Sequence, residues 1–176
     1  LSNNGIGVEV SEFSLSDLTA ENIAFLRAKW VEYGLIVFPK LPLSHDEFKD
    51  FALSFGEFGD DPFISSLPDY PNIAEIKRSA KEKATPFGGT WHSDWSFMKK
   101  PPSATLLHSK IIPPVGGNTL FANTEKAFAA LPDEMKDKLR NLKVIHSAKI
   151  PYADDGFYAL EKEEPVSYTH LTLPTK

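Results

Sequence analysis

His92 and Asp94 offer the clearest chemistry in this sequence. Two residues apart on an extended segment, their side chains project to the same side, so an imidazole nitrogen and a carboxylate oxygen can reach one metal ion. Two histidines and one carboxylate form the facial ligand set that holds Fe(II) and leaves its other face open. The pair would supply two of these three ligands. The alternative is a chance triplet, a surface histidine beside a capping aspartate.

The neighbours of this pair favour the ligand interpretation. Trp91 and Trp95 flank it, and two glycines at 88 and 89 precede it. Glycines beside a polar pair allow a ligand to approach the backbone closely. The segment is therefore predicted to lie at a binding site rather than on a featureless surface.

The elements that must position the pair are predicted from apolar spacing and capping signals. Residues 17–19 offer N-caps for a helix that Gly34 ends. Ser44 and Glu47 form a capping box that opens a second helix, which ends at Gly56. Two later helices are expected over 123–130 and 131–139. Strands are expected over 8–10, 35–38, 73–77, 104–112, 119–122 and 142–148.

Composition narrows the classes of partner. The 176 residues carry a net charge of -5, and the basic residues are scattered, which argues against nucleic acid. The sequence has no cysteine, so any metal must rely on histidine and carboxylate ligands. No apolar run approaches the roughly 20 residues of a membrane span. We expect a cytoplasmic protein that binds neither nucleic acid nor membrane.

Three blocks in order resemble the taurine dioxygenase (TauD/TfdA) family, which includes the herbicide-degrading 2,4-dichlorophenoxyacetate dioxygenase. They are residues 90–97 (Thr-Trp-His-Ser-Asp-Trp-Ser-Phe), 101–104 (Pro-Pro-Ser-Ala) and 116–121 (Gly-Gly-Asn-Thr-Leu-Phe). The resemblance implies an α+β, mainly β fold: a double-stranded β-helix, or jelly roll of the clavaminate synthase type, with flanking helices. It would be truncated before its C-terminal strands, with the domain occupying 1–165.

The resemblance also implies an activity. Fe(II) would be the metal, 2-oxoglutarate and O2 the cosubstrates, and the complete protein would hydroxylate a small organic substrate with release of succinate and CO2. His92 and Asp94 match the first two iron ligands. Thr119 matches the threonine that binds a carboxylate of 2-oxoglutarate, although from its own context it is an ordinary strand residue after a turn. Homo-oligomerisation is left open.

The third iron ligand and the arginine that pairs with 2-oxoglutarate are expected beyond this chain, so this fragment alone should be inactive. His170 lies within 166–176, a stretch that differs in sequence character from what precedes it and continues no predicted element. This stretch is predicted to be a non-native tail, so His170 is rejected as the third ligand. His108 and His146 are predicted to be structural and His45 to lie on the surface.

Three residues bear on the substrate. Asp61 stands near the place where sulfonate-binding members have a histidine, and Gly88 replaces a polar residue that contacts taurine. Both differences argue against taurine, although an aspartate before a proline is also a common turn former. Trp95 is predicted to line the substrate pocket, with core packing as an equal alternative.

Other functions remain open from sequence. One alternative is a jelly-roll module that binds a small molecule or a metal ion without turnover. Another is an inactive gene fragment. A hydrolase that uses His92 as a base is the weakest alternative, because no serine or cysteine nucleophile motif accompanies it.

Overall fold

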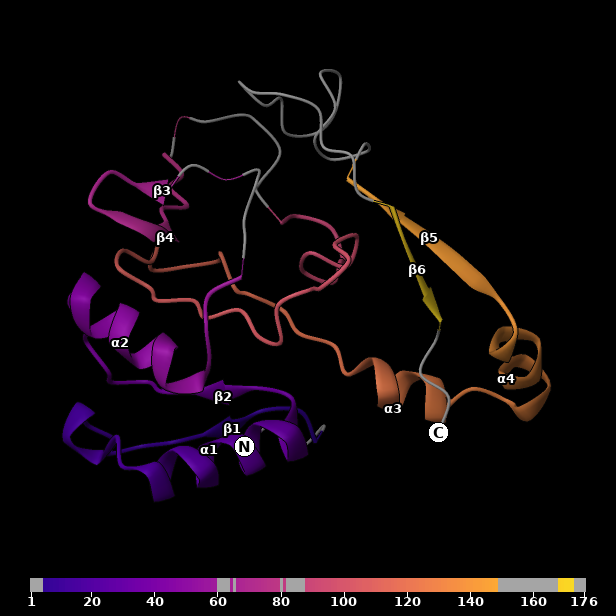
Figure 1. Ribbon diagram of the computed structural model, residues 1–176, viewed down its shortest axis with the longest axis horizontal. Coiled ribbons are helices and arrows are strands. Elements are labelled where there is room, and N and C mark those ends of the chain that lie inside the picture. Colours follow the sequence, from indigo (N-terminus) through magenta and orange to yellow (C-terminus); the bar gives the residue numbers. More distant parts are fainter. Residues whose placement is uncertain are drawn as a thin grey trace. The chain divides into compact units, whose positions relative to one another are not determined.

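The computed structural model describes residues 5–59, 64, 66–79, 81, 88–148 and, as backbone, 168–172. Figure 1 labels the helices and strands along the chain. The chain divides into two compact units. The first comprises Leu1–Glu57 with Leu106–Asp133, and the second comprises Phe58–Thr105 with Glu134–Lys176.

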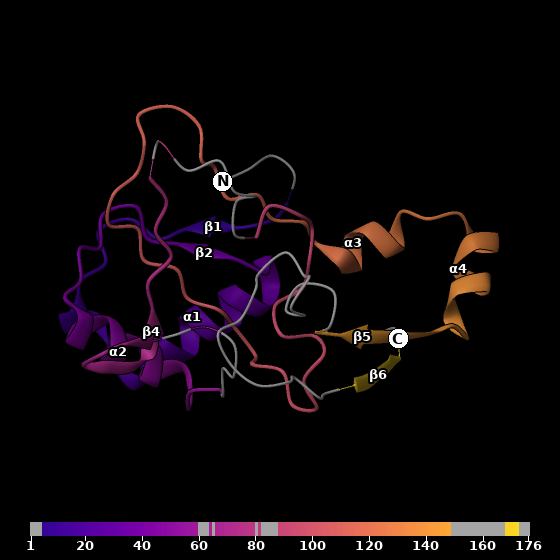
Figure 2. The ribbon, with the colours of Figure 1, turned by 90° about the horizontal axis from the view of Figure 1, so that it is seen from above.

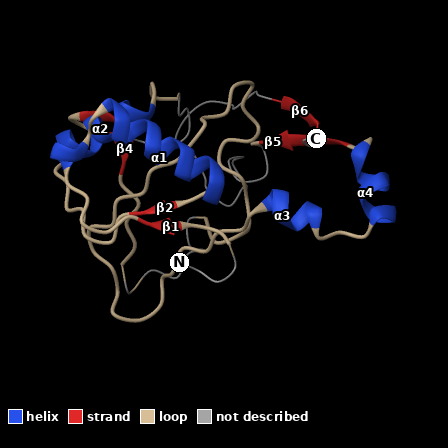
Figure 3. Ribbon diagram, turned by 90° about the horizontal axis from the view of Figure 1, so that it is seen from below, coloured by secondary structure: helices blue, strands red, loops and turns tan. Residues whose placement is uncertain are grey.

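The first unit opens with a parallel strand pair connected by a helix. Strand β1 (Val8–Glu9) pairs with β2 (Ile36–Val37), as predicted for these two segments. Helix α1 (Ala20–Tyr33) forms the connection and runs alongside both strands (Figure 3). A short 3-10 helix at Leu15–Asp17 precedes α1. The predicted α/β opening is confirmed.

Both ends of α1 follow from local sequence signals. The Thr19 hydroxyl accepts a hydrogen bond from the backbone N–H of Asn22, which satisfies a donor that the first helical turn leaves unpaired. Gly34 ends the helix in the left-handed conformation, with φ at 73°, where a side chain would be strained. Leu26, near the middle of α1, is 2% exposed and anchors the helix to the unit.

Helix α2 (His45–Phe55) begins at the predicted capping box. Ser44 accepts from the backbone N–H of Glu47, and the Glu47 carboxylate accepts from the backbone N–H of Ser44. Gly56 follows the last helical residue. The helix buries Phe51, which packs edge-on against Phe38 with ring centroids 5.5 Å apart. An aromatic cluster therefore joins α2 to the strand pair.

The later part of the first unit is mostly irregular. Helix α3 (Thr124–Ala129) forms as predicted, with Asn123 as its N-cap. The strands predicted at 119–122 and over 104–112, which begins in the second unit, do not form. Their large apolar side chains are exposed instead, Ile111 to 96% and Leu120 to 69%. A strand requires a neighbour to satisfy its backbone groups, and among the described residues these segments have none in a sheet.

The second unit contains two antiparallel strand pairs. Strand β3 (Ser66–Leu67) pairs with β4 (Tyr70–Ala74), so the strand predicted at 73–77 begins earlier and ends before residue 75. Strand β5 (Lys143–Ser147), predicted from sequence, pairs with β6 (Tyr168–Thr172) (Figure 2). The segment predicted to be a non-native tail therefore supplies β6.

Helix α4 (Asp133–Arg140) spans the boundary between the two units in the sequence and forms where the second late helix was predicted. Its exposed surface carries local ion pairs, including Lys138 with Glu134. Over the described ranges, no helix is long and apolar enough to cross a bilayer.

Candidate metal centre

His92 and Asp94 lie together in the second unit, on a turn-rich segment. His92 Nε2 stands 3.0 Å from Asp94 Oδ1, and the two side chains are 49% and 45% exposed. The other ring nitrogen of His92, Nδ1, lies 2.7 Å from the backbone carbonyl of Thr90. Because a carbonyl only accepts hydrogen bonds, Nδ1 carries the hydrogen. In the neutral ring, Nε2 then presents its lone pair toward the carboxylate.

This arrangement fits a cation between the two side chains. A lone pair and a carboxylate oxygen repel each other at 3.0 Å unless a positive charge lies between them. A proton on Nε2 gives an ordinary ion pair, whereas a metal ion makes both atoms ligands. At metal–ligand distances of about 2.1 Å, two ligands at a right angle stand about 3.0 Å apart. The observed separation of 3.0 Å fits neighbouring ligands on an octahedral ion and equally fits a hydrogen-bonded ion pair.

The second oxygen of Asp94 has a partner of its own. Asp94 Oδ2 accepts a hydrogen bond from the Thr105 hydroxyl at 2.6 Å. Sequence reasoning missed Thr105, because the contact spans 11 positions and follows no periodic pattern. The hydroxyl orients the carboxylate in the way that hydrogen-bond partners commonly orient metal ligands.

The segment after the ligand pair is anchored by a small apolar cluster. Phe97 and Ala148 are buried, and Trp95 and Met98 pack against them. The Trp95 and Phe97 rings meet edge-on, with centroids 5.7 Å apart. Trp95 has a φ of 49°, a backbone conformation that bulky residues rarely adopt and that persists where packing enforces it. The core-packing role weighed for Trp95 is thus present, and its role in substrate binding stays a prediction.

A polar contact adds to this anchoring. His146, on β5, lies with Nδ1 2.7 Å from the Ser96 hydroxyl, in a partly buried setting. His146 in β5 and Ala148 just after it therefore hold the segment that follows His92 and Asp94, through Ser96 and the apolar cluster. The prediction that His146 is structural agrees with this contact.

The other predicted site residues are distributed as follows. Gly88 lies beside His92, since a Cβ on Gly88 would stand 3.4 Å from His92 Cε1. Thr119 is exposed and belongs to the first unit, whereas His92 and Asp94 belong to the second. Asp61 lies outside the described residues.

No third ligand accompanies the pair in the described part of the chain. That part contains no group of three histidine, aspartate or glutamate side chains that could hold a metal ion. His108 packs against Phe48 in the first unit. His45 is the first residue of α2, and His170 lies in β6 opposite Ile145.

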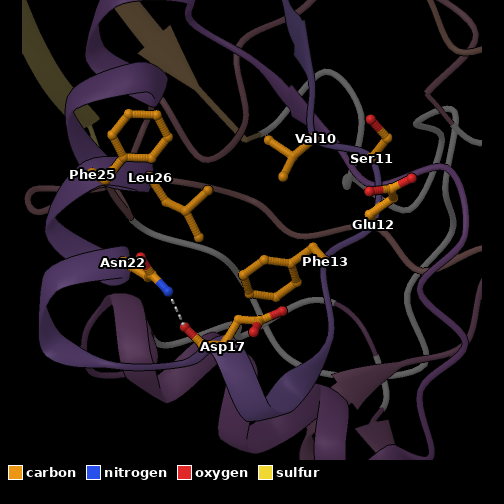
Figure 4. Close-up of a pocket in the computed structure, with 8 residues that line it drawn as sticks. All are labelled: Val10, Ser11, Glu12, Phe13, Asp17, Asn22, Phe25 and Leu26. Carbon is orange, nitrogen blue, oxygen red and sulfur yellow. Dashed lines mark hydrogen bonds between the residues drawn. The ribbon is translucent and has the colours of Figure 1, made fainter.

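A surface pocket in the first unit contains none of the predicted site residues (Figure 4). Two of its polar residues make local hydrogen bonds: the Asp17 carboxylate accepts from Ser14, and the Asn22 side chain donates to the Asp17 carbonyl at 2.9 Å. Val10, Phe13, Phe25 and Leu26 are among its apolar lining residues. Ser11 and Glu12 complete its polar lining.

Comparison with known proteins agrees with the motif blocks. Residues 1–172 match the family described as "Taurine catabolism dioxygenase TauD, TfdA family". An (S)-phenoxypropionate/alpha-ketoglutarate-dioxygenase from Sphingobium herbicidovorans is 30% identical over 80% of this chain and 50% of its own length. An alpha-ketoglutarate-dependent sulfonate dioxygenase from Saccharomyces cerevisiae is 29% identical over 94% of this chain and 43% of its own length.

The fold has a counterpart among solved structures. The structure of a putative alpha-ketoglutarate-dependent taurine dioxygenase from Burkholderia xenovorans superposes with a TM-score of 0.70 at 26% identity. The match covers 84% of this chain and 52% of that one. The chain thus spans about half the length of the relatives that it matches. With a family match over 172 positions, this chain belongs to the TauD/TfdA family of dioxygenases.

Proposed function

We propose that the whole protein is a non-haem Fe(II)- and 2-oxoglutarate-dependent dioxygenase that hydroxylates a small organic substrate. The observation that carries this proposal is the separation of 3.0 Å between His92 Nε2 and Asp94 Oδ1 in a member of this family. Several relatives bear names that specify alpha-ketoglutarate dependence, which supports the same cosubstrate here.

His92 and Asp94 would hold the metal by Nε2 and Oδ1. Fe(II) held there, together with 2-oxoglutarate and O2, supplies an oxidation in which one oxygen atom enters a C–H bond and the other enters succinate as CO2 is lost. The Thr90 carbonyl keeps the hydrogen of His92 on Nδ1, so that Nε2 stays available as a ligand. The third ligand would be a histidine outside the matched half of the family domain.

Thr119 would bind a carboxylate of 2-oxoglutarate. Its exposed hydroxyl is a hydrogen-bond donor that suits a carboxylate oxygen. This role requires the jelly roll of the family, in which 104–112 and 119–122 become strands. The exposed apolar side chains of these segments, Ile111 and Leu120 among them, support this proposal, because a completed sheet would cover them.

The substrate would be a small organic anion that is not taurine. Relatives are named for phenoxypropionate, 2,4-dichlorophenoxyacetate, sulfonate and sulfate ester substrates, all of which are anionic at neutral pH. Asp61, Gly88 and Trp95 would face the substrate. A carboxylate at Asp61 would repel a sulfonate, so we favour an anion whose charged group is held elsewhere in the pocket.

A second candidate is a metal-binding module without turnover. One observation favours it for the chain as it stands: the described residues provide two ligands and no third. Two ligands bind a metal weakly and cannot complete the facial set. This candidate predicts metal binding without consumption of 2-oxoglutarate.

The deciding experiment measures succinate formed from 2-oxoglutarate in air with Fe(II) and ascorbate. It compares this chain, the whole protein, and the whole protein with His92→Ala. We expect turnover in the whole protein, loss of turnover with His92→Ala, and none in this chain. His45→Ala serves as a matched control, because it removes a histidine from the start of α2, outside the proposed centre. A folded, iron-loaded whole protein that forms no succinate would favour the binding module.

A further inference from the structure

We infer that Thr105 is a positioning residue that keeps Asp94 bound to the metal through a single oxygen. This inference rests on the proposed function, because it assumes that His92 and Asp94 are ligands. It adds a residue that neither the motif blocks nor the comparisons assign.

The two oxygens of Asp94 have different neighbours. Oδ1 faces His92 Nε2 at 3.0 Å, while Oδ2 accepts from the Thr105 hydroxyl at 2.6 Å. A carboxylate only accepts hydrogen bonds, so the hydroxyl is the donor. A separation of 2.6 Å falls in the range of charge-assisted O–H···O⁻ bonds, which are roughly twice as strong as neutral ones. Thr105 thus occupies the oxygen that the metal does not need.

The hydrogen bond matters because the carboxylate is accessible to water. The Asp94 side chain is 45% exposed, so burial does not prevent its terminal group from rotating. Rotation would bring Oδ2 toward the ion and allow both oxygens to bind. Thr105 opposes this rotation from a separate segment, 11 positions along the chain, which follows the Pro101-Pro102 pair.

The number of oxygens that bind decides how many positions stay open. In a six-coordinate centre, two histidines and one carboxylate oxygen leave three positions, enough for a bidentate keto acid and for dioxygen. A carboxylate that binds through both oxygens leaves two. The keto acid would then fill the centre and exclude dioxygen. By holding Oδ2, Thr105 preserves the third open position.

The test compares three variants of the whole protein, which supplies all three ligands, with Mn²⁺, a stand-in for Fe(II) that does not oxidise in air. Thr105→Val removes the hydroxyl at nearly constant shape, and Thr105→Ser retains it. Ser103→Ala, which removes an exposed hydroxyl on the same segment, is the matched control. Electron paramagnetic resonance of free Mn²⁺ gives the dissociation constant. Hyperfine spectroscopy in isotopically labelled water counts the water molecules on the bound ion.

We expect Thr105→Val to lower Mn²⁺ affinity by about 10-fold, the scale typical when a metal ligand loses its hydrogen-bond partner. The bound ion should also carry one water molecule fewer. Thr105→Ser and Ser103→Ala should match the unmodified whole protein in both measurements. Unchanged affinity and water count in Thr105→Val would overturn the positioning role. So would equal effects of Val and Ser at position 105.

A fourth variant separates this inference from the proposed function. His92→Ala should abolish the Mn²⁺ binding seen in the unmodified whole protein. If binding does not depend on His92, the assignment of His92 and Asp94 as metal ligands is wrong, and the role of Thr105 is overturned with it. If His92→Ala abolishes binding while Thr105→Val binds normally, the centre stands and only the role of Thr105 is overturned.

Discussion

Gly88 lies against the imidazole of His92, so that a Cβ at position 88 would stand 3.4 Å from His92 Cε1. Gly88 also has a φ of 67°, which L-residues rarely adopt. We therefore predict that Gly88→Ala strains the backbone by about 1–2 kcal/mol and weakens metal binding, because relief of this strain shifts the backbone beside the His92 ring. Mn²⁺ titration with a parallel urea denaturation would measure both effects.

Gly34 provides the matched control for this substitution. It has a φ of 73°, and a Cβ added there would meet open space, with nothing within 4 Å of it. Gly34→Ala should lower the free energy of unfolding by a similar amount and leave Mn²⁺ affinity unchanged. Equal Mn²⁺ affinities in the Gly88 and Gly34 variants would contradict the proposed contact with His92.

The capping box of α2 predicts that removal of the Ser44 hydroxyl lowers the stability of the fold. Ser44→Ala removes the acceptor for the Glu47 backbone N–H, and the expected loss is about 1 kcal/mol in the free energy of unfolding. Urea denaturation near neutral pH, followed by circular dichroism, would measure it. A loss below about 0.3 kcal/mol would mean that solvent satisfies the first turn of α2 equally well.

The same box predicts a pH dependence. The hydrogen bond from the Ser44 backbone N–H lowers the pKa of Glu47 below its ordinary value of 4.5. The carboxylate therefore stabilises the fold above about pH 4.5, and this contribution is lost as the pH falls through the lower pKa of the folded state. Glu47→Gln keeps an acceptor but does not titrate, so its stability should fall less on acidification. Parallel pH profiles for the two proteins would contradict this prediction.

His108 predicts a second pH dependence, near neutrality. Burial first, then the positive charge of Lys110 and the neighbouring His45, lower the pKa of His108 below its ordinary value of 6.5. The unfolded chain therefore takes up a proton before the folded chain does, and stability falls as the pH drops below about 6.5. His108→Phe should reduce this loss while keeping the ring contact with Phe48.

The measurement for His108 is the urea midpoint on either side of its ordinary pKa, at about pH 7.5 and about pH 5.5. His45→Gln serves as the control, because it leaves the burial of His108 in place and should keep most of the loss on acidification. If His108→Phe and the unmodified chain lose the same amount of stability on acidification, another titrating group causes the loss in this pH range.

The contact between Ser96 and His146 predicts an energetic coupling between the ligand segment and β5. In a double-mutant cycle of Ser96→Ala and His146→Phe, the expected coupling is about 1 kcal/mol for a partly buried hydrogen bond. Amide exchange at Met98, whose N–H donates to the Trp95 carbonyl, should speed up in Ser96→Ala. Additive losses of stability in the cycle would show that the hydrogen bond does not couple the two elements.

Local sequence signals determined the helices and the part of the site whose residues are close together in the sequence. The N-cap at Thr19, the capping box at Ser44 and the glycine at 34 act within one helical turn, so their effects are visible in a few consecutive residues. His92 and Asp94 are separated by a single residue, and the sequence alone predicted that their side chains would lie together.

Tertiary structure decided what depends on residues far apart in the chain. The hydroxyl of Thr105 reaches Asp94 across 11 positions, and Ser96 meets His146 across 50. The apolar run at 104–112 has strand composition yet forms no strand, because a strand exists only when another backbone segment satisfies its N–H and C=O groups. Composition expresses a preference for strand, whereas pairing is a property of two segments, and no single segment can encode the presence of its partner.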